Sequence, residues 1–147
     1  MQYRNDKNGT PLSVLGYGCM RFTKKGTGID VAKAEQEILT AYNAGVNYFD
    51  TAYVYSGSEA ALGEILERNG LRDKVYIATK LPQYMINDRS GLDRYFNEEL
   101  KRLRTDHVDF YLMHNVYENS IDIYMDEERK ESAANGMITL LPHLDGC

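Results

Sequence analysis

The sequence has little of what marks a disulfide-bonded protein or a metalloprotein. It contains two cysteines, Cys19 and Cys147, and neither belongs to a Cys-x-x-Cys or Cys/His cluster. Two separate thiols make neither a disulfide framework nor a ligand set for zinc or an iron–sulfur cluster. We therefore expect a reduced protein that binds no metal.

Long apolar stretches and basic runs are missing as well. No stretch approaches the roughly 18 consecutive apolar residues that a membrane helix requires, and the N-terminus is too polar for a signal peptide. Basic residues gather at most in pairs such as Lys24-Lys25, and the net charge is -5. Because nucleic-acid binding needs a concentrated basic surface, we expect a cytoplasmic protein with neither a nucleic acid nor a membrane as partner.

The pattern that is present alternates short apolar segments with amphipathic ones, in a chain of 147 residues that is long enough to bury a core. A hairpin is expected over residues 1–15, because turn residues at 6–9 separate two short strand-like runs. Four expected strands follow, with three expected helices between them. The strands cover 16–20, 47–49, 74–79 and 108–113, and the helices 31–43, 58–69 and 91–104.

This order of strand, loop and helix predicts an α/β fold. The expected strands are short and almost continuously apolar, as in a parallel sheet that is buried on both faces. We predict a partial (β/α)8 TIM barrel of about four parallel strands with helices, preceded by an N-terminal β-hairpin.

Four local details belong to this prediction. Asp30 is a good N-cap for the first helix, and Ser58 is expected to cap the second. Residues 26–28 are expected to form a plain loop. Glu99 is the one polar residue on the otherwise apolar face of the third helix.

Titratable side chains stand where the expected strands end. A parallel barrel builds its active site in this way, from residues at the carboxyl ends of several strands. The ends are Asp50, with Tyr55 five residues later, then Lys80 and then His114.

These four side chains predict a tuned proton donor. A tyrosine is a poor acid at neutral pH, with an ordinary pKa of about 10. An ammonium group nearby would lower the pKa of Tyr55, and Lys80 is placed to provide it, with Asp50 as the counter-ion that a buried ammonium needs. His114 can hydrogen-bond a substrate oxygen. The group would therefore donate a proton near neutral pH and orient a carbonyl.

Each residue alone also has a structural explanation. Asp50 can cap a turn, and Lys80 can lie in solvent at a strand end. Tyr55 is one of 12 tyrosines and His114 is one of three histidines. The joint pattern favours a site, because three consecutive strand ends that carry an acid with a phenol, an ammonium and an imidazole are hard to obtain by accident.

Five short motifs occur in order, and the second is highly specific. They are GYGCM at 16–20, NYFDTAYVY at 47–55, SEAALGE at 58–64, VYIATK at 75–80 and VDFYLMH at 108–114. Over about residues 1–115 this set resembles the aldo/keto reductase family. The N-terminus looks closest to a bacterial group that usually carries a C-terminal ferredoxin-like segment, whose cysteine cluster is absent here.

The resemblance implies an NADPH-dependent oxidoreductase that reduces aldehydes or ketones to alcohols, with NADP(H) as cofactor and a small carbonyl compound as substrate. Tyr55 would donate the proton, Lys80 held by Asp50 would lower its pKa, and His114 would orient the carbonyl. Glycines in a strand also fit a tight barrel corner, but in this family the first strand end contacts the nicotinamide. The implied cofactor contacts are Gly18, Cys19, Met20 and Asp50.

The chain departs from the family after His114. A (β/α)8 barrel typically needs about 250 residues, and residues 116–147 contain no further unit and none of the cofactor-binding groups of the family's later strands. We predict a truncated member with two parts. Residues 1–115 form the N-terminal half of a barrel, and residues 116–147 form a divergent tail that is helical or poorly ordered.

Two functions are consistent with such a chain. It is either a carbonyl reductase, alone or by pairing halves, or an inactive half-barrel remnant that acts as a binding or association module. Open sheet edges favour self-association in both cases. A nucleotide-binding open sheet ranks last, because no glycine-rich loop opens a helix with phosphate-binding spacing.

Overall fold

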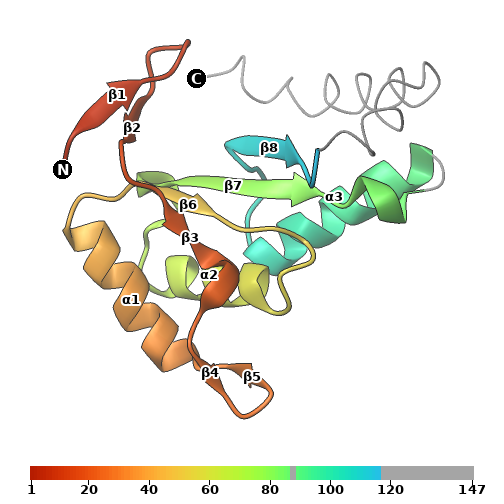
Figure 1. The fold of residues 1–147 in the computed structure, drawn as a ribbon, viewed down its shortest axis with the longest axis horizontal. Helices are drawn as coiled ribbons and strands as arrows, with labels where there is room; N and C mark the ends of the chain where they lie inside the picture. The colour runs from red at the N-terminus through yellow and green to blue at the C-terminus, as the bar shows by residue number, and fades with distance from the viewer. Residues whose placement is uncertain (87–88, 117–147) are drawn as a thin grey trace.

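The computed structural model describes residues 1–86 and 89–116 as an α/β fold (Figure 1). Apart from its first residue, the expected tail over 116–147 lies outside the described residues. Cys147 lies there too, while Cys19 is a free and buried cysteine.

Four strands form one parallel sheet in the order β3-β6-β7-β8. This order follows the chain, as it does in a barrel, and it confirms the expected partial barrel with four parallel strands. The described residues form no closed barrel. The strands are β3 (Tyr17–Gly18), β6 (Tyr48–Asp50), β7 (Tyr76–Leu81) and β8 (Phe110–Met113).

Three helices connect these strands and lie on one side of the sheet (Figure 1). Asp30 caps the first of them as expected, because its Oδ1 accepts a hydrogen bond from the Lys33 amide at 3.1 Å. The helices are α1 (Val31–Asn43), α2 (Ser58–Arg68) and α3 (Arg89–Leu103), with 3-10 turns η1 (Cys19–Arg21), η2 (Arg72–Lys74) and η3 (Gln83–Met85).

The core lies between the sheet and the helices. Phe49 of β6 and Ile77 of β7 meet a helical layer that contains Ile38 and Leu62, and all four side chains are fully buried. Burial of each side chain of this size contributes about 1.5–3 kcal/mol. Hydrophobic packing therefore fixes the strands from which the polar strand ends extend.

The N-terminal hairpin, β1 (Tyr3–Asn5) with β2 (Pro11–Ser13), confirms the expected antiparallel pair. It is attached through Asn47, whose side chain accepts a hydrogen bond from the Ser13 amide and donates one to the Pro11 carbonyl, both at 2.8 Å. Since Asn47 precedes β6, the hairpin lies at the amino end of the sheet, opposite to Asp50.

The expected loop over residues 26–28 is a turn at 26–27 that joins two short strands, and the sequence did not predict those strands. Strands β4 (Lys24–Lys25) and β5 (Gly28–Ile29) form a second antiparallel hairpin. Gly26 begins its two-residue turn with a positive φ of 64°, a conformation that glycine adopts without steric cost. The run is too short and too polar for the alternation that usually reveals a strand.

The expected cap of α2 is also wrong. Gly57 is the N-cap, in a left-handed conformation, and Ser58 is the first helical residue. The Ser58 hydroxyl is engaged elsewhere, because it donates to the Cys19 carbonyl at 2.8 Å and lies 2.8 Å from the Thr51 hydroxyl. It therefore ties the first two strand ends together instead of capping its helix.

Helices α2 and α3 approach most closely at Gly63. A Cβ atom at this position would lie 2.5 Å from the carbonyl carbon and oxygen of Leu103 and 2.6 Å from the carbonyl oxygen of Arg102. These are backbone atoms, so a side chain here cannot be accommodated by a rotamer change. The glycine is required for the packing of α3 behind β7.

We expect Gly63→Ala to destabilise the fold by about 2 kcal/mol, because the overpacking outweighs the better helix propensity of alanine. Urea unfolding followed by circular dichroism measures the difference. Gly28→Ala is the matched control, since a Cβ at Gly28 meets no atom within 4 Å. Equal stabilities of the two variants would contradict the close approach of the helices.

Candidate functional site

The predicted strand-end residues come together at the carboxyl edge of the sheet. Asp50 is the last residue of β6, Lys80 is near the end of β7, and His114 directly follows β8. Tyr55 lies in the loop after β6, where its amide donates to the Ala52 carbonyl at 3.0 Å. Parallel strands bring these ends to one edge although the residues are far apart in sequence.

Lys80 and Asp50 form the central ion pair. Lys80 Nζ lies 2.6 Å from Asp50 Oδ1 and also donates to the Thr51 carbonyl at 2.6 Å. The Lys80 side chain is 15% exposed and that of Asp50 is 34% exposed. The ammonium therefore has a charged and a neutral acceptor in a largely desolvated position, and both contacts fix where it lies.

Tyr55 lies between this ammonium and the imidazole of His114. Lys80 Nζ is 5.1 Å from the centre of the Tyr55 ring, and the Tyr55 and His114 rings meet edge to face with their centres 5.7 Å apart. The Tyr55 side chain is half-buried. The phenol is thus held by two partners and still reaches the surface.

His114 is buried, with 6% of its surface exposed. Burial first and the positive charge of Lys80 second hold the pKa of His114 below its ordinary value of 6.5, and Asp50 opposes them. The imidazole is therefore neutral at neutral pH. A neutral imidazole offers one donor and one acceptor nitrogen, which suits a group that orients a polar substrate.

The expected cofactor contacts lie beside this group but differ in orientation. Gly18 is in register with Asp50 on the neighbouring strand, and a Cβ there would meet no atom within 4 Å. The Met20 side chain is 58% exposed, whereas Cys19 is fully buried in the core. Burial raises the pKa of the Cys19 thiol, so this side chain is an inert part of the packing.

Arg102, Tyr53 and the Thr51 carbonyl also shape the site, and the sequence did not indicate them. Arg102 of α3 donates to the Tyr53 carbonyl at 3.3 Å, and its guanidinium carbon lies 4.1 Å from the centre of the Tyr53 ring. The two residues are 49 positions apart. Sequence periodicity gives no signal for a contact at this separation.

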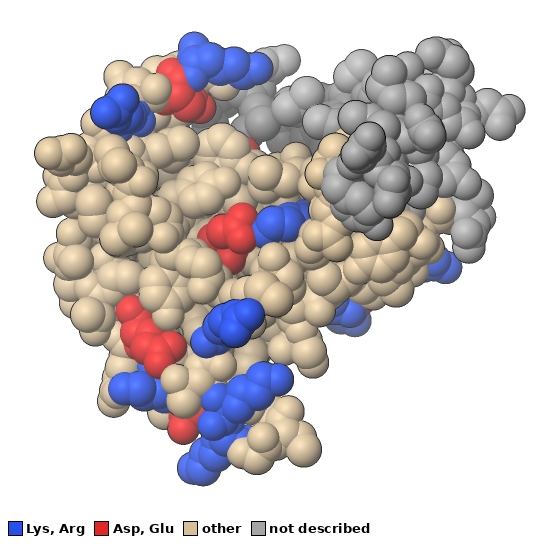
Figure 2. All heavy atoms as spheres, viewed as in Figure 1, with Lys and Arg blue, Asp and Glu red and all other residues tan. Residues whose placement is uncertain are grey.

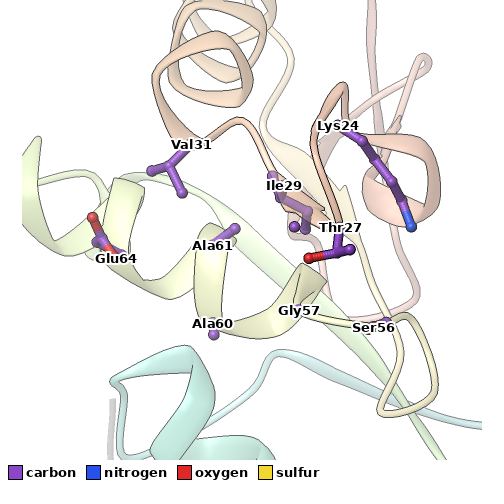
Figure 3. Close-up of a pocket in the computed structure, with 10 residues that line it drawn as sticks. Lys24, Thr27, Ile29, Val31, Ser56, Gly57, Ala60, Ala61 and Glu64 are labelled. Carbon is purple, nitrogen blue, oxygen red and sulfur yellow. The ribbon is translucent and has the colours of Figure 1, made fainter.

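A pocket of about 230 Å³ lies on the other side of the Tyr55 loop (Figure 3). It is formed by the hairpin β4–β5 and the start of α2, with Ile29, Val31 and Ala61 as apolar lining and Lys24 and Glu64 at opposite ends. None of the four strand-end residues belongs to it. The predicted chemistry is therefore not located in this pocket.

The surface and the remaining polar groups add no other site. Figure 2 shows acidic side chains beside basic ones on the face viewed there, and no continuous area of one sign. Among the described residues no group of three or more potential metal ligands occurs. None of the helices in that part of the chain combines the length and apolar character needed to cross a bilayer.

Comparison with known proteins agrees with this geometry. The sequence profile described as "Aldo/keto reductase family" matches residues 14–137. The chain belongs to the aldo/keto reductase family. An aldo-keto reductase of Mycolicibacterium vanbaalenii is 36% identical over 111 residues, which cover 75% of this chain and 36% of that protein.

Solved structures of other aldo/keto reductases share the fold. One from Pseudomonas aeruginosa superimposes with a TM-score of 0.77 at 28% identity, covering 95% of this chain and 56% of that one. One from Klebsiella pneumoniae, solved in complex with NADPH, gives a TM-score of 0.74 at 20% identity and is covered to 46%. The chain thus spans about a third of the curated relative's length and about half of these solved chains.

We expect a double-mutant cycle with Asp50→Asn and Lys80→Met to give a coupling energy of about 1 kcal/mol or more, because the pair is short and partly buried. Urea unfolding of the four proteins measures it. The exposed pair Arg104–Glu67, at 2.7 Å with side chains 45% and 59% exposed, is the control and should couple more weakly. Equal coupling in both cycles would contradict the central place of the Asp50–Lys80 pair.

Proposed function

We propose that the chain carries the proton-donating part of an NADPH-dependent carbonyl reductase active site. The observation that supports this most directly is one phenol in contact with both an ammonium and a neutral imidazole. Lys80 Nζ lies 5.1 Å from the Tyr55 ring centre, and the His114 ring meets the same ring edge to face at 5.7 Å. These are the elements that protonation of a carbonyl oxygen requires.

In the proposed reaction Tyr55 gives its hydroxyl proton to the oxygen of an aldehyde or ketone. The positive charge of Lys80 stabilises the phenolate that remains, and Asp50 holds this ammonium in place. His114 donates a hydrogen bond to the same carbonyl oxygen and fixes its direction. The product is the corresponding alcohol.

The residues present fit the nicotinamide end of the cofactor. Open space above Gly18, next to Asp50, leaves room for a flat ring close to the backbone. When bound, NADPH supplies the hydride. We assign the cofactor contacts to Gly18, the exposed Met20, the backbone at Cys19 and the side chain of Asp50. The groups that hold the dinucleotide phosphates have to come from outside the described residues, because the longer relatives extend well beyond the matched part.

The substrate in this proposal is a small aldehyde or ketone, and the place of the reaction is the cytoplasm. The half-buried position of Tyr55 admits a carbonyl group without a deep channel. The mixed charges visible on the face in Figure 2 favour no strongly charged substrate.

We expect Tyr55→Phe to lower kcat for reduction of an aromatic aldehyde by about 10²–10⁴-fold, the contribution of a positioned general acid. NADPH oxidation followed by its absorbance measures the rate, and cofactor fluorescence measures binding, which should be unchanged. Tyr3→Phe is the matched control, because Tyr3 is 50% exposed and lies in the hairpin at the amino end of the sheet. Unchanged turnover in Tyr55→Phe would rule out Tyr55 as the acid.

As a second candidate function, we propose self-association through the edge of the sheet. β8 is one of the two edge strands of the sheet among the described residues, and its last two side chains, Leu112 and Met113, are 39% and 37% exposed. Unpaired strand edges with apolar side chains favour pairing with another chain, here a second copy. Sedimentation should then show a dimer that Leu112→Lys dissociates, and a wild-type monomer at micromolar concentration would contradict the proposal.

A further inference from the structure

A buried polar cluster lies directly behind the strand ends, between the sheet and helices α2 and α3. Its two carboxylates, Glu59 and Glu99, are 2% and 0% exposed. Three other side chains complete it, and each comes from a different part of the sheet edge or of α3. They are Thr79 of β7, Tyr111 of β8 and Arg102 of α3.

The contacts in the cluster form a continuous chain. Tyr111 donates to Glu99 Oε2 at 2.7 Å, and Thr79 Oγ1 lies 3.5 Å from Glu99 Oε1 and 2.7 Å from Glu59 Oε1. Arg102 Nη1 donates to Glu59 Oε2 at 3.3 Å. This series of contacts thus runs from β8, through β7 and α2, to α3.

The hydrogen bonds in this cluster favour a proton on Glu99. The single hydroxyl proton of Thr79 can serve only one of the two carboxylates, and the shorter contact assigns it to Glu59. Glu99 Oε1, 3.5 Å from Thr79 Oγ1, then receives no hydrogen from Thr79, and an anionic oxygen without that donor is costly in a side chain that is 0% exposed. A proton on Glu99 removes this cost.

The charges lead to the same result. Arg102 is the one cation that contacts either buried carboxylate within the described residues, and it also bonds to Glu98 at 3.1 Å. Two buried anions beside one shared cation are unfavourable. Burial, with a smaller effect of the Glu59 charge, raises the pKa of Glu99 to about 8, and the hydrogen bond from Tyr111 and the charge of Arg102 only partly oppose this rise.

The series of contacts ends at the loop that carries Tyr55. The guanidinium of Arg102, besides contacting Glu59, donates to the Tyr53 carbonyl and stacks on the Tyr53 ring. Tyr95 of α3 meets the same ring edge to face, with centres 4.9 Å apart. Tyr53 is therefore clamped from α3, two residues before Tyr55.

We propose that Arg102 is a positioning residue for the Tyr53–Tyr55 loop, and that a proton held on Glu99 keeps Arg102 in position through Thr79 and Glu59. Loss of this proton places two anions around one hydroxyl and draws Arg102 toward the cluster and away from Tyr53. The role of Tyr55 as a proton donor rests on the proposed function. The contacts by which Arg102 holds Tyr53 in place do not depend on that function.

The pH dependence has a definite sign. The pKa of Glu99 rises from 4.5 in the unfolded chain to about 8 in the fold. Protonated Glu99 therefore contributes a stabilising free energy that is complete below pH 4.5 and is lost as the pH rises through about 8. The other titratable groups that face Glu99 are Glu59, Arg102 and Tyr111, and burial also raises the pKa of Glu59. Alkaline conditions should therefore loosen the clamp.

Hydrogen exchange of the Tyr55 amide tests the clamp without any turnover. We expect Arg102→Met to reduce its protection by about tenfold, and Arg102→Lys to restore part of it because an ammonium still reaches the Tyr53 carbonyl. The matched control is Arg68→Met, on the exposed surface of α2, which should leave the protection unchanged. Equal protection in Arg102→Met and Arg68→Met would overturn the positioning role.

The proton is tested with Glu99→Gln, which keeps the shape of the neutral acid. In the wild type, protection of the Tyr55 amide should fall by about tenfold between about pH 6 and about pH 9, after correction for intrinsic exchange, and it should stay constant in Glu99→Gln. Infrared spectra near neutral pH should show a carboxylic acid band that Glu99→Gln removes. The same pH dependence in both proteins, or no such band in the wild type, would overturn the proposal.

These readouts separate the clamp from the chemistry. If NADPH and a carbonyl give no turnover while the exchange results hold, the proposed function fails and the clamp stands. If Tyr55→Phe abolishes turnover while Arg102→Met leaves loop protection and kcat unchanged, the clamp fails and the proposed function stands.

Discussion

The ion pair between Lys80 and Asp50 is the constraint on which the arrangement of the strand ends depends. An ammonium with 15% exposure needs an anion and a further acceptor, and it finds them in Asp50 and in the Thr51 carbonyl, both at 2.6 Å. These contacts hold the end of β7 against the end of β6. Tyr55 then lies close to a fixed charge, with the His114 ring against its own ring.

Hydroxyl groups and an arginine stabilise the two ends of the sheet in different ways. At the carboxyl end, Ser58 joins the Cys19 carbonyl to Thr51, so the first two strands end in register. Near the amino end, Arg72 pairs with Asp109 at 3.0 Å and donates to the Val75 carbonyl, which ties β7 to β8. Both groups use side chains that precede or follow the strands.

Much of this arrangement could be predicted from the sequence, because an apolar run followed by a titratable residue indicates both a strand and the position where it ends. The order of strands, the cap at Asp30 and the convergence of Asp50 and Lys80 follow from that pattern. The prediction that Ser58 caps α2 was wrong because its hydroxyl lies within reach of the buried Cys19 carbonyl. A hydrogen bond to that carbonyl stabilises the hydroxyl more than a position at the helix terminus would. The contacts of Arg102 could not be predicted from the sequence, because its partners Glu59 and Tyr53 lie 43 and 49 residues away.

Glu99 shows how a departure from the pattern carries information about the site. A polar residue on an apolar helix face usually weakens the expectation of burial, yet Glu99 is completely buried. It is tolerated because Tyr111 donates a hydrogen bond to it and the Thr79 hydroxyl lies 3.5 Å away, both in the strands that lead to His114 and Lys80. The same strands thus present polar ends to the proposed substrate and a proton-holding cluster to the helices. A change of charge in the buried cluster consequently acts on the strands and the loop that position Tyr55. The protonation of Glu99 is thereby coupled to the position of the Tyr53–Tyr55 loop.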